Sequence, residues 1–233
     1  MIFKFIIVFT LLFHTLKLYV LRRYDLSLKN MHSIVSSLVS TLHAIMTLCI
    51  MLRIYFMLPE TLYHEPQLYL QCHSEMILPP VRLTLAYMLY DLFWAIYYNN
   101  ITKGILLHHC VTSTAMIAAL ISPYGRYSTF IMFLNEASTP FLNFHTISSI
   151  LRDQGIYYVP DRITNMNRFV FFVVFFFSRI VILSKLAFGV YSQFKFQSLI
   201  INSMVALFSS HYLLNIYWFG LMCRKMMKLI RKN

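Results

Sequence analysis

Two adjacent histidines, His108 and His109, are the side chains of this sequence best suited to chemistry. Imidazole titrates near neutral pH, so it can act as a base, an acid or a nucleophile. Thr112 lies one helical turn later, between the two imidazole directions, where its hydroxyl can fix a tautomer. Neighbouring helical side chains point about 100° apart, so the pair alone is a poor metal ligand, and we expect no metal and no cofactor.

A second polar element surrounds Glu136, which shares a helix face with Thr139 and Asn143. Pro140 removes the N–H that would bind the Glu136 carbonyl, and a free carbonyl at membrane depth is tolerated only where protein or water satisfies it. The sequence therefore predicts that a helix kink and a polar pocket meet near Glu136. The alternative is an ordinary proline kink that is satisfied by Ser138 or a neighbour.

Further ionisable side chains interrupt the apolar stretches, and each costs about 2.5–3.5 kcal/mol on insertion scales. We expect them to face one another or a wet cavity, and the alternative is a structural ion pair of Asp91 or Glu136 with Arg179. Helical spacing adds Trp94 to the face of Asp91, and it adds Asn215 to the face of His211. The predicted cavity residues are Asp91, Trp94, Thr112, Thr139, Asn143, Arg179, His211 and Asn215.

The composition places these residues in a membrane protein. The chain has 233 residues, of which 59% are hydrophobic and 12% charged, whereas a soluble domain carries about 25% charge. A membrane helix needs about 20 mostly apolar residues. Seven stretches qualify or nearly qualify, at 2–21, 34–58, 81–98, 105–122, 127–150, 168–190 and 198–222. We therefore predict an all-α, multi-pass membrane protein with about seven transmembrane helices.

The distribution of positive charge predicts the orientation, because cytosolic loops are rich in Lys and Arg. One side would hold Arg22, Arg23, Lys29, Lys103, Arg152, Arg162, Arg168, Arg224, Lys225, Lys228, Arg231 and Lys232, and the other Lys4, Arg82, Arg126 and Lys195. This count of twelve against four places the C-terminus in the cytosol. The same pattern explains the net charge of +12, so we expect no binding to nucleic acid.

Taken together, these motifs resemble the TLC-domain family, which includes the ceramide synthases. The His108-His109-x-x-Thr112 element is similar to the histidine motif of that family. The run 136–143, together with 178–180 and 215–218, looks most like the subgroup around TLC domain-containing protein 4. The resemblance covers about residues 33–230.

The resemblance implies a six-helix bundle of two inverted three-helix repeats, preceded by an extra helix. Residues 1–32 would hold the first span and a basic cytosolic loop, and 33–233 the TLC domain with its basic cytosolic tail. It also implies a central cavity for a fatty acyl chain and residence in the endoplasmic reticulum.

In ceramide synthases the histidine pair serves acyl transfer from acyl-CoA to a long-chain base, which would make His108 and His109 catalytic, with Glu136 as their partner. Those enzymes continue with a His-Asp-x-x-Asp element, where this chain has Asn135, Glu136 and Thr139. We therefore expect a protein that binds membrane lipids and acts in lipid homeostasis. The alternative is an acyl-CoA-dependent N-acyltransferase. A seven-helix receptor is disfavoured because Cys72 stands alone in its predicted loop. The oligomeric state stays open.

Overall fold

The computed structural model describes residues 1–57, 75–122, 126–192 and 199–230, and it is helical throughout these ranges apart from short turns. The helices are α1 (Ile2–Arg23), α2 (Leu28–Tyr55), η2 (Glu75–Ile77), α4 (Leu78–Tyr97), α5 (Lys103–Ile121), α6 (Arg126–Met132), η3 (Phe133–Ser138), α7 (Thr139–Asp153), α8 (Asp161–Phe175), η4 (Phe176–Val181), α9 (Ile182–Ser192) and α10 (Leu199–Ile230). Four residues used in the sequence analysis lie outside the described residues. They are Cys72 of the predicted loop and the charged residues Lys195, Arg231 and Lys232.

These helices form seven rods in the described part of the chain, because α6–η3–α7 and α8–η4–α9 each run on without a loop. Five rods are long and apolar enough to cross a membrane: 2–23, 28–55, 75–97, 103–121 and 161–192. The rods 126–153 and 199–230 complete the set. The prediction of an all-α, multi-pass membrane protein is confirmed, and the inverted-repeat relation between its halves stays a prediction.

Several helices begin at capping residues that the sequence provides. Ser27 accepts the N–H of Asn30 at 3.2 Å, and Thr102 accepts the N–H of Ile105 at 3.3 Å. α2 begins at residue 28 where the predicted span began at 34, and α8 begins at 161 where the span began at 168. Hydropathy marks the apolar length of a helix, and the polar first turns of α2 and α8 lie outside it. Ser27 caps α2, whereas α8 follows Pro160 with no side-chain cap.

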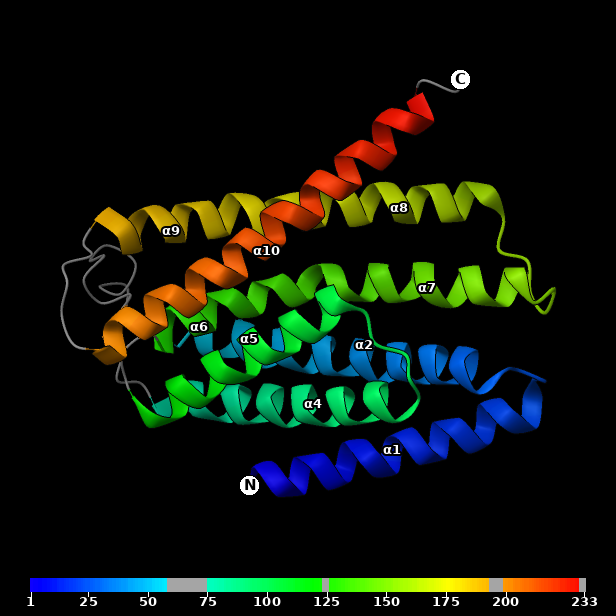
Figure 1. The fold of residues 1–233 in the computed structure, drawn as a ribbon, viewed down its shortest axis with the longest axis horizontal. Coiled ribbons are helices and arrows are strands. Elements are labelled where there is room, and N and C mark those ends of the chain that lie inside the picture. The colour runs from blue at the N-terminus through cyan, green and yellow to red at the C-terminus, as the bar shows by residue number, and fades with distance from the viewer. Residues whose placement is uncertain (58–74, 123–125, 193–198, 231–233) are drawn as a thin grey trace.

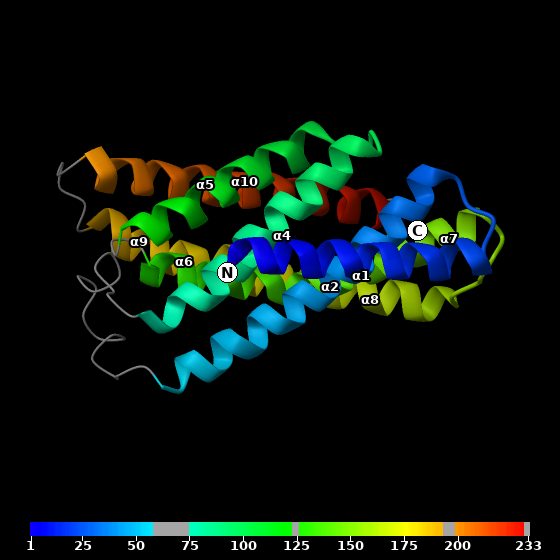
Figure 2. The same cartoon turned by 90° about the horizontal axis from the view of Figure 1, so that it is seen from below.

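Six rods pack as a bundle, and α1 lies along its outside against α4 and α2 (Figures 1 and 2). Phe13 of α1 is fully buried and stacks on Trp94 with ring centroids 5.2 Å apart. Lys17 donates to the Tyr98 hydroxyl at 2.9 Å. The aromatic end of α4 therefore anchors α1, and Trp94 serves that contact.

Candidate functional site

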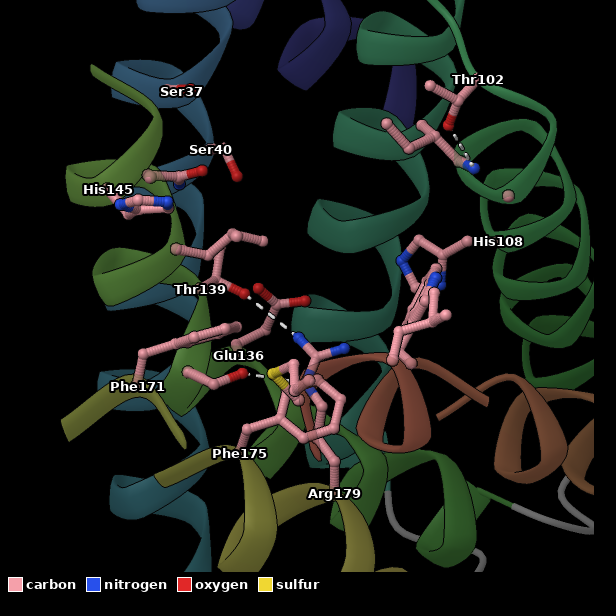
Figure 3. Close-up of a pocket in the computed structure, with 18 of the residues that line it drawn as sticks. Ser37, Ser40, Thr102, His108, Glu136, Thr139, His145, Phe171, Phe175 and Arg179 are labelled. Carbon is pink, nitrogen blue, oxygen red and sulfur yellow. Dashed lines mark hydrogen bonds between the residues drawn. The ribbon is translucent and has the colours of Figure 1, made fainter. Parts of the chain in front are cut away.

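A cavity of about 1040 Å³ lies among α2, α4, α5, η3, α7, α8, η4 and α10 (Figure 3). This volume is at the upper end of the range of small-molecule sites, which are mostly apolar with a few placed polar groups. The apolar lining consists of Met88, Ile105, Leu142, Phe171, Phe172, Phe175, Trp218, Leu221, Met222 and Met226. Such walls suit a chain of methylene groups.

The polar wall begins with Asp91 on α4 and His109 on α5. Asp91 Oδ2 lies 3.2 Å from His109 Nε2, and both side chains are buried. The hydroxyl of Ser36 on α2 donates to the other carboxylate oxygen of Asp91. A carboxylate that takes the Nε2–H fixes both the ring orientation and the tautomer of His109. Asp91 thereby links three helices at one point of the cavity wall.

His108 directly precedes His109 on α5 and also lines the cavity. Its Nδ1 lies 3.5 Å from the Thr112 hydroxyl, which is a long and weak contact. The ring packs against those of His211 and Trp218, with centroids 5.8 Å and 5.5 Å away. Among the described residues no partner hydrogen-bonds its Nε2. That nitrogen is the imidazole atom available to a ligand.

Arg179 lies in η4, a π-helical turn whose backbone bonds span five residues. Its guanidinium donates through Nε to the Asn135 carbonyl at 3.1 Å and to Ser138 at 2.9 Å. One terminal nitrogen donates to Asn215 at 3.3 Å, and the other to Thr139 at 3.4 Å. Single π turns occur often at functional sites. Here the turn carries a cation that holds η3 and α10 together.

The break expected at Pro140 is present, but the Glu136 carbonyl is not left free. The Thr139 N–H binds the carbonyl of Glu136, three residues back, in the tighter 3₁₀ pattern of η3. The carbonyl of Asn135 thereby loses this N–H and accepts instead from Arg179 and from the Ser138 hydroxyl, each at 3.1 Å. The Thr139 N–H thus satisfies the Glu136 carbonyl, which the sequence predicts to be free, and Arg179 adds a side-chain hydrogen bond to the Asn135 carbonyl one residue earlier.

Glu136 projects into the cavity and is half-buried (Figure 3). In the described part of the chain its carboxylate has no hydrogen bond or ion pair. The alternative, an ion pair of Arg179 with Asp91 or Glu136, is not formed, because Asp91 is held by His109 and Arg179 by neutral oxygens. Glu136 is left as an acid open to a ligand.

Behind the cavity wall, His211 and Asn215 of α10 are buried and complete the polar cluster. The Asn135 side-chain amide and His211 Nε2 lie 2.8 Å apart. Asn215 donates to the His211 carbonyl at 2.8 Å while its oxygen accepts from Arg179. These side chains support the wall and do not line the space itself.

The structure brings most of the predicted site residues together. Those that line the cavity are Asp91, His108, His109, Glu136, Thr139, Asn143 and Arg179. Thr112, His211 and Asn215 lie immediately behind them, in contact with His108 or Arg179. Trp94 is the exception, because it stacks on Phe13 of α1 outside the cavity.

Sequence reasoning missed two stripes of lining residues. Ser36, Ser37 and Ser40 lie on α2, and Arg168, Phe171 and Phe175 lie on α8. The second stripe continues to Arg179 at intervals of three or four residues, which is a signal that periodicity alone can detect. Lys225 on α10 and His145 on α7 also line the cavity. The described residues contain no group of three or more His, Cys, Asp or Glu side chains placed to hold a metal.

The fold and the cavity together define a multi-pass helical membrane protein with a partly open, largely apolar cavity that carries a polar cluster. A family model for the TLC domain matches residues 33–224, which is most of the chain, and the protein belongs to the TLC-domain family. The match begins after α1, so the anchored outer helix is not part of the matched domain. A search among curated proteins gives no match.

Proposed function

We propose that this protein binds an acyl lipid in its cavity and thereby acts in membrane lipid homeostasis. The observation that carries the proposal is the cavity of about 1040 Å³ whose walls include Phe171, Phe172 and Phe175 on one side and Trp218 and Leu221 on the other. Membership of the TLC-domain family supports a lipid-related role. Apolar walls favour an acyl chain, because each methylene buried contributes about 0.8 kcal/mol.

The altered acidic element supports binding in preference to acyl transfer. Asn135 is turned toward His211, and the Thr139 hydroxyl accepts from Arg179. Two of the three positions that differ from the ceramide synthase pattern therefore serve packing. Only Glu136 of these three keeps a free acid facing the cavity.

Photo-crosslinking tests lipid binding directly. A photoactivatable fatty acid, incorporated into the lipids of cells that make the full chain, should label Leu142, Phe171 and Phe175 by mass spectrometry of peptides. Labelling confined to outward side chains such as Phe188, which is 78% exposed, would show lipid only around the bundle and would contradict the proposal.

The second candidate function is acyl-CoA-dependent N-acyl transfer, and the arrangement of Asp91, His109 and His108 favours it. His108 Nε2 would take a proton from the incoming amine while the amine nitrogen attacks the thioester carbonyl carbon. The carbon–sulfur bond then breaks, the thiolate receives that proton from His108, and an amide and free coenzyme A leave. Asp91 holds the second imidazole, that of His109, which would lie beside the reacting thioester carbonyl.

This activity is tested with labelled acyl-CoA and a panel of long-chain amines and lysolipids. If transfer occurs, His108→Ala should lower turnover by about 10²–10⁴-fold, because general-base help has that magnitude. The control is His14→Ala on the exposed side of α1. Absence of transfer by the wild type, combined with lipid crosslinked in the cavity, leaves binding as the function.

Two finer assignments belong to the same proposal. The element 136–143 and the run 215–218 support a place near the subgroup around TLC domain-containing protein 4. The family resemblance supports residence in the endoplasmic reticulum. Co-localisation of a tagged full chain with markers of that organelle, and of the plasma membrane, tests the second assignment.

A further inference from the structure

One end of the cavity carries positive charge from two different helices. Arg168 of α8 and Lys225 of α10 both line the space, and both are exposed. His145 of α7 lines it beside them and is half-buried. We call this end of the cavity the basic mouth (His145, Arg168 and Lys225). The positive charges of Arg168 and Lys225 have no carboxylate partner among the described residues.

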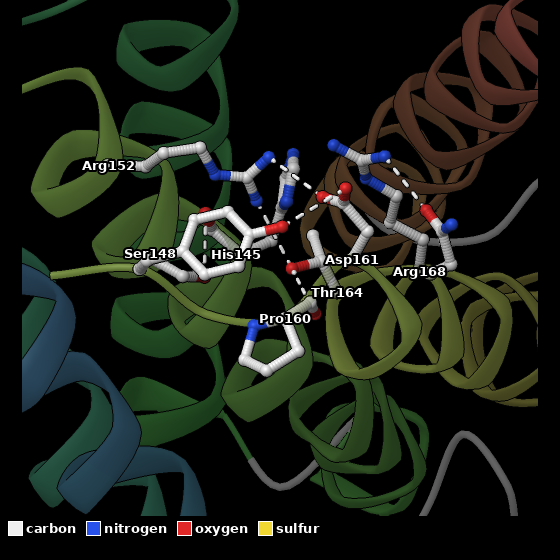
Figure 4. A network of polar contacts seen from close by, with 9 residues as sticks. His145, Ser148, Arg152, Pro160, Asp161, Thr164 and Arg168 are labelled. Atoms are coloured by element: carbon white, nitrogen blue, oxygen red, sulfur yellow. Dashed lines mark hydrogen bonds and ion pairs between the residues drawn. The ribbon is translucent and has the colours of Figure 1, made fainter.

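The turn between α7 and α8 holds the basic mouth in place. Arg152 donates to Asp161 at 3.4 Å and to Thr164 at 3.1 Å, so the end of α7 is tied to the start of α8 (Figure 4). Within the described ranges Arg168 donates to Asn165 alone, one turn back on its own helix. The guanidinium edge that does not face Asn165 stays free for a ligand.

The cavity changes character with depth. Along α8 and η4, Arg168 and Arg179 are separated by eleven residues, or roughly 16 Å of helix at 1.5 Å per residue. The lining between them on this side is Phe171, Phe172 and Phe175. The acids of the lining, Asp91 and Glu136, belong to the deep cluster with His109 and Arg179 and not to the basic mouth. An occupant thus meets cations first and then aromatic walls.

We propose that the basic mouth binds a phosphate group, so that the ligand is an amphiphile carrying a phosphate and an apolar chain that enters between the phenylalanines. Arg and Lys are the usual partners of phosphate, and their hydrogen bonds to it are charge-assisted. This inference rests on the proposed function, because it names the class of lipid that the cavity takes.

The general preference for Lys and Arg on one side of a membrane protein accounts for cations near the helix ends, but not for cations that face a cavity. Arg162 on α8 and Arg224 on α10 show the difference. Both are exposed, both lie within six residues of the mouth residue on the same helix, and neither lines the cavity. They provide a control with the same helices and the same change of charge.

The test compares two ligands that differ only in phosphate, a phosphatidic acid and the diacylglycerol with identical chains. Binding to the purified full-length protein is measured by native mass spectrometry titration. The wild type should bind phosphatidic acid at least about tenfold more tightly, since each nearby Lys or Arg attracts an anionic lipid. Arg168→Gln/Lys225→Gln should remove that preference and leave diacylglycerol binding unchanged, while Arg162→Gln/Arg224→Gln should keep it.

Two results would overturn the phosphate site while leaving lipid binding intact. One is equal affinity of the wild type for the two ligands together with acyl-CoA binding that does not depend on Arg168 and Lys225, and the other is equal loss in both double variants. Binding of neither ligand by the wild type would overturn the lipid-binding proposal and this inference together. A third titration with long-chain acyl-CoA identifies the source of the phosphate. If only acyl-CoA depends on Arg168 and Lys225, the phosphate site stands and its source is the nucleotide carrier.

Discussion

At the scale of single residues, the contact between Asp91 and His109 organises the polar wall. Asp91 accepts from Ser36 at one oxygen and meets His109 at the other. His109 Nδ1 is buried and has no hydrogen-bond partner among the described residues. The proton of this imidazole therefore belongs on Nε2, toward the carboxylate.

Asp91→Asn changes the shape of this side chain little but alters its hydrogen bonding. The amide oxygen can still accept from Ser36, but the amide N–H then faces His109 and drives the imidazole proton to Nδ1, where the described residues offer no acceptor. An unsatisfied buried donor costs about 1–3 kcal/mol, and we expect the free energy of unfolding in detergent to fall by that amount.

The matched control is Asp161→Asn, which breaks the exposed pair with Arg152. Exposed ion pairs contribute about 0–1 kcal/mol, so this change should be close to neutral. Equal effects of Asp91→Asn and Asp161→Asn would show that Asp91 does not hold His109.

The sequence identified His108, His109 and Glu136 as cavity residues but not their partners. A helical face tells which side chains point the same way, not which helix lies opposite them. One alternative pairs Asp91 with Arg179, but Asp91 meets His109 because α4 packs directly against α5. Trp94 shares the face of Asp91 one turn further on, where α1 covers that face.

At the scale of secondary structure, the cavity depends on two helix breaks that face each other. η3 shifts the backbone bonds to the 3₁₀ pattern, and η4 places the Arg179 guanidinium where it binds the Asn135 carbonyl. Pro140 made the first break predictable, since proline removes a helix hydrogen bond. The π turn at Phe176–Val181 contains neither Gly nor Pro, so no local signal in the sequence marks it.

Arg179→Lys tests whether the fork of hydrogen bonds joins these breaks. A lysine keeps the charge but cannot reach the Asn135 carbonyl, Ser138 and Asn215 at once, because it lacks the planar guanidinium. Freeing one or two of these buried acceptors should lower the free energy of unfolding by about 1–3 kcal/mol.

Arg162→Lys, at an exposed position of α8, should leave the thermal midpoint unchanged. Thermal unfolding is measured for both variants under the same conditions. If Arg179→Lys unfolds at the wild-type temperature, the guanidinium network is not what holds η3 against η4.

At the scale of the whole molecule, the positive charges gather at one end of the bundle. The ends of α1, α7 and α10 and the starts of α2 and α8 lie toward that end (Figure 1). Arg22, Arg23, Arg152, Arg168 and Lys225 lie at or near these ends. This arrangement has the asymmetry on which the predicted orientation rests.

The orientation is tested with epitope tags in selectively permeabilised cells. We expect a C-terminal tag to be accessible from the cytosol and an N-terminal tag to be protected, because Lys and Arg favour the cytosolic side. A protected C-terminal tag would reverse the orientation, and tags on the same side would contradict an odd number of spans.

The number of helices and the all-α class were predictable from hydropathy, because a membrane span needs a long apolar run. A cavity was also predicted from the buried polar residues, but its size and full lining were not, because they depend on how the helices pack. Its two overlooked stripes, the serines of α2 and the phenylalanines of α8, are ordinary in a lipid-facing helix. Only the packing turns them inward.

The central proposal is that the cavity holds an acyl lipid, and variants that fill the cavity test this proposal most directly. Ser37→Phe/Ser40→Phe adds two rings to its α2 wall, whereas Ser203→Phe/Ser210→Phe adds the same rings at exposed positions of α10. Lipid retained by each purified protein is measured by native mass spectrometry, with thermal unfolding as a check on folding. We predict that the wild type and the α10 variant retain an acyl lipid and that the α2 variant, folded, does not. Equal lipid retention by both variants, or a wild type free of lipid, would show that the cavity does not hold an acyl lipid.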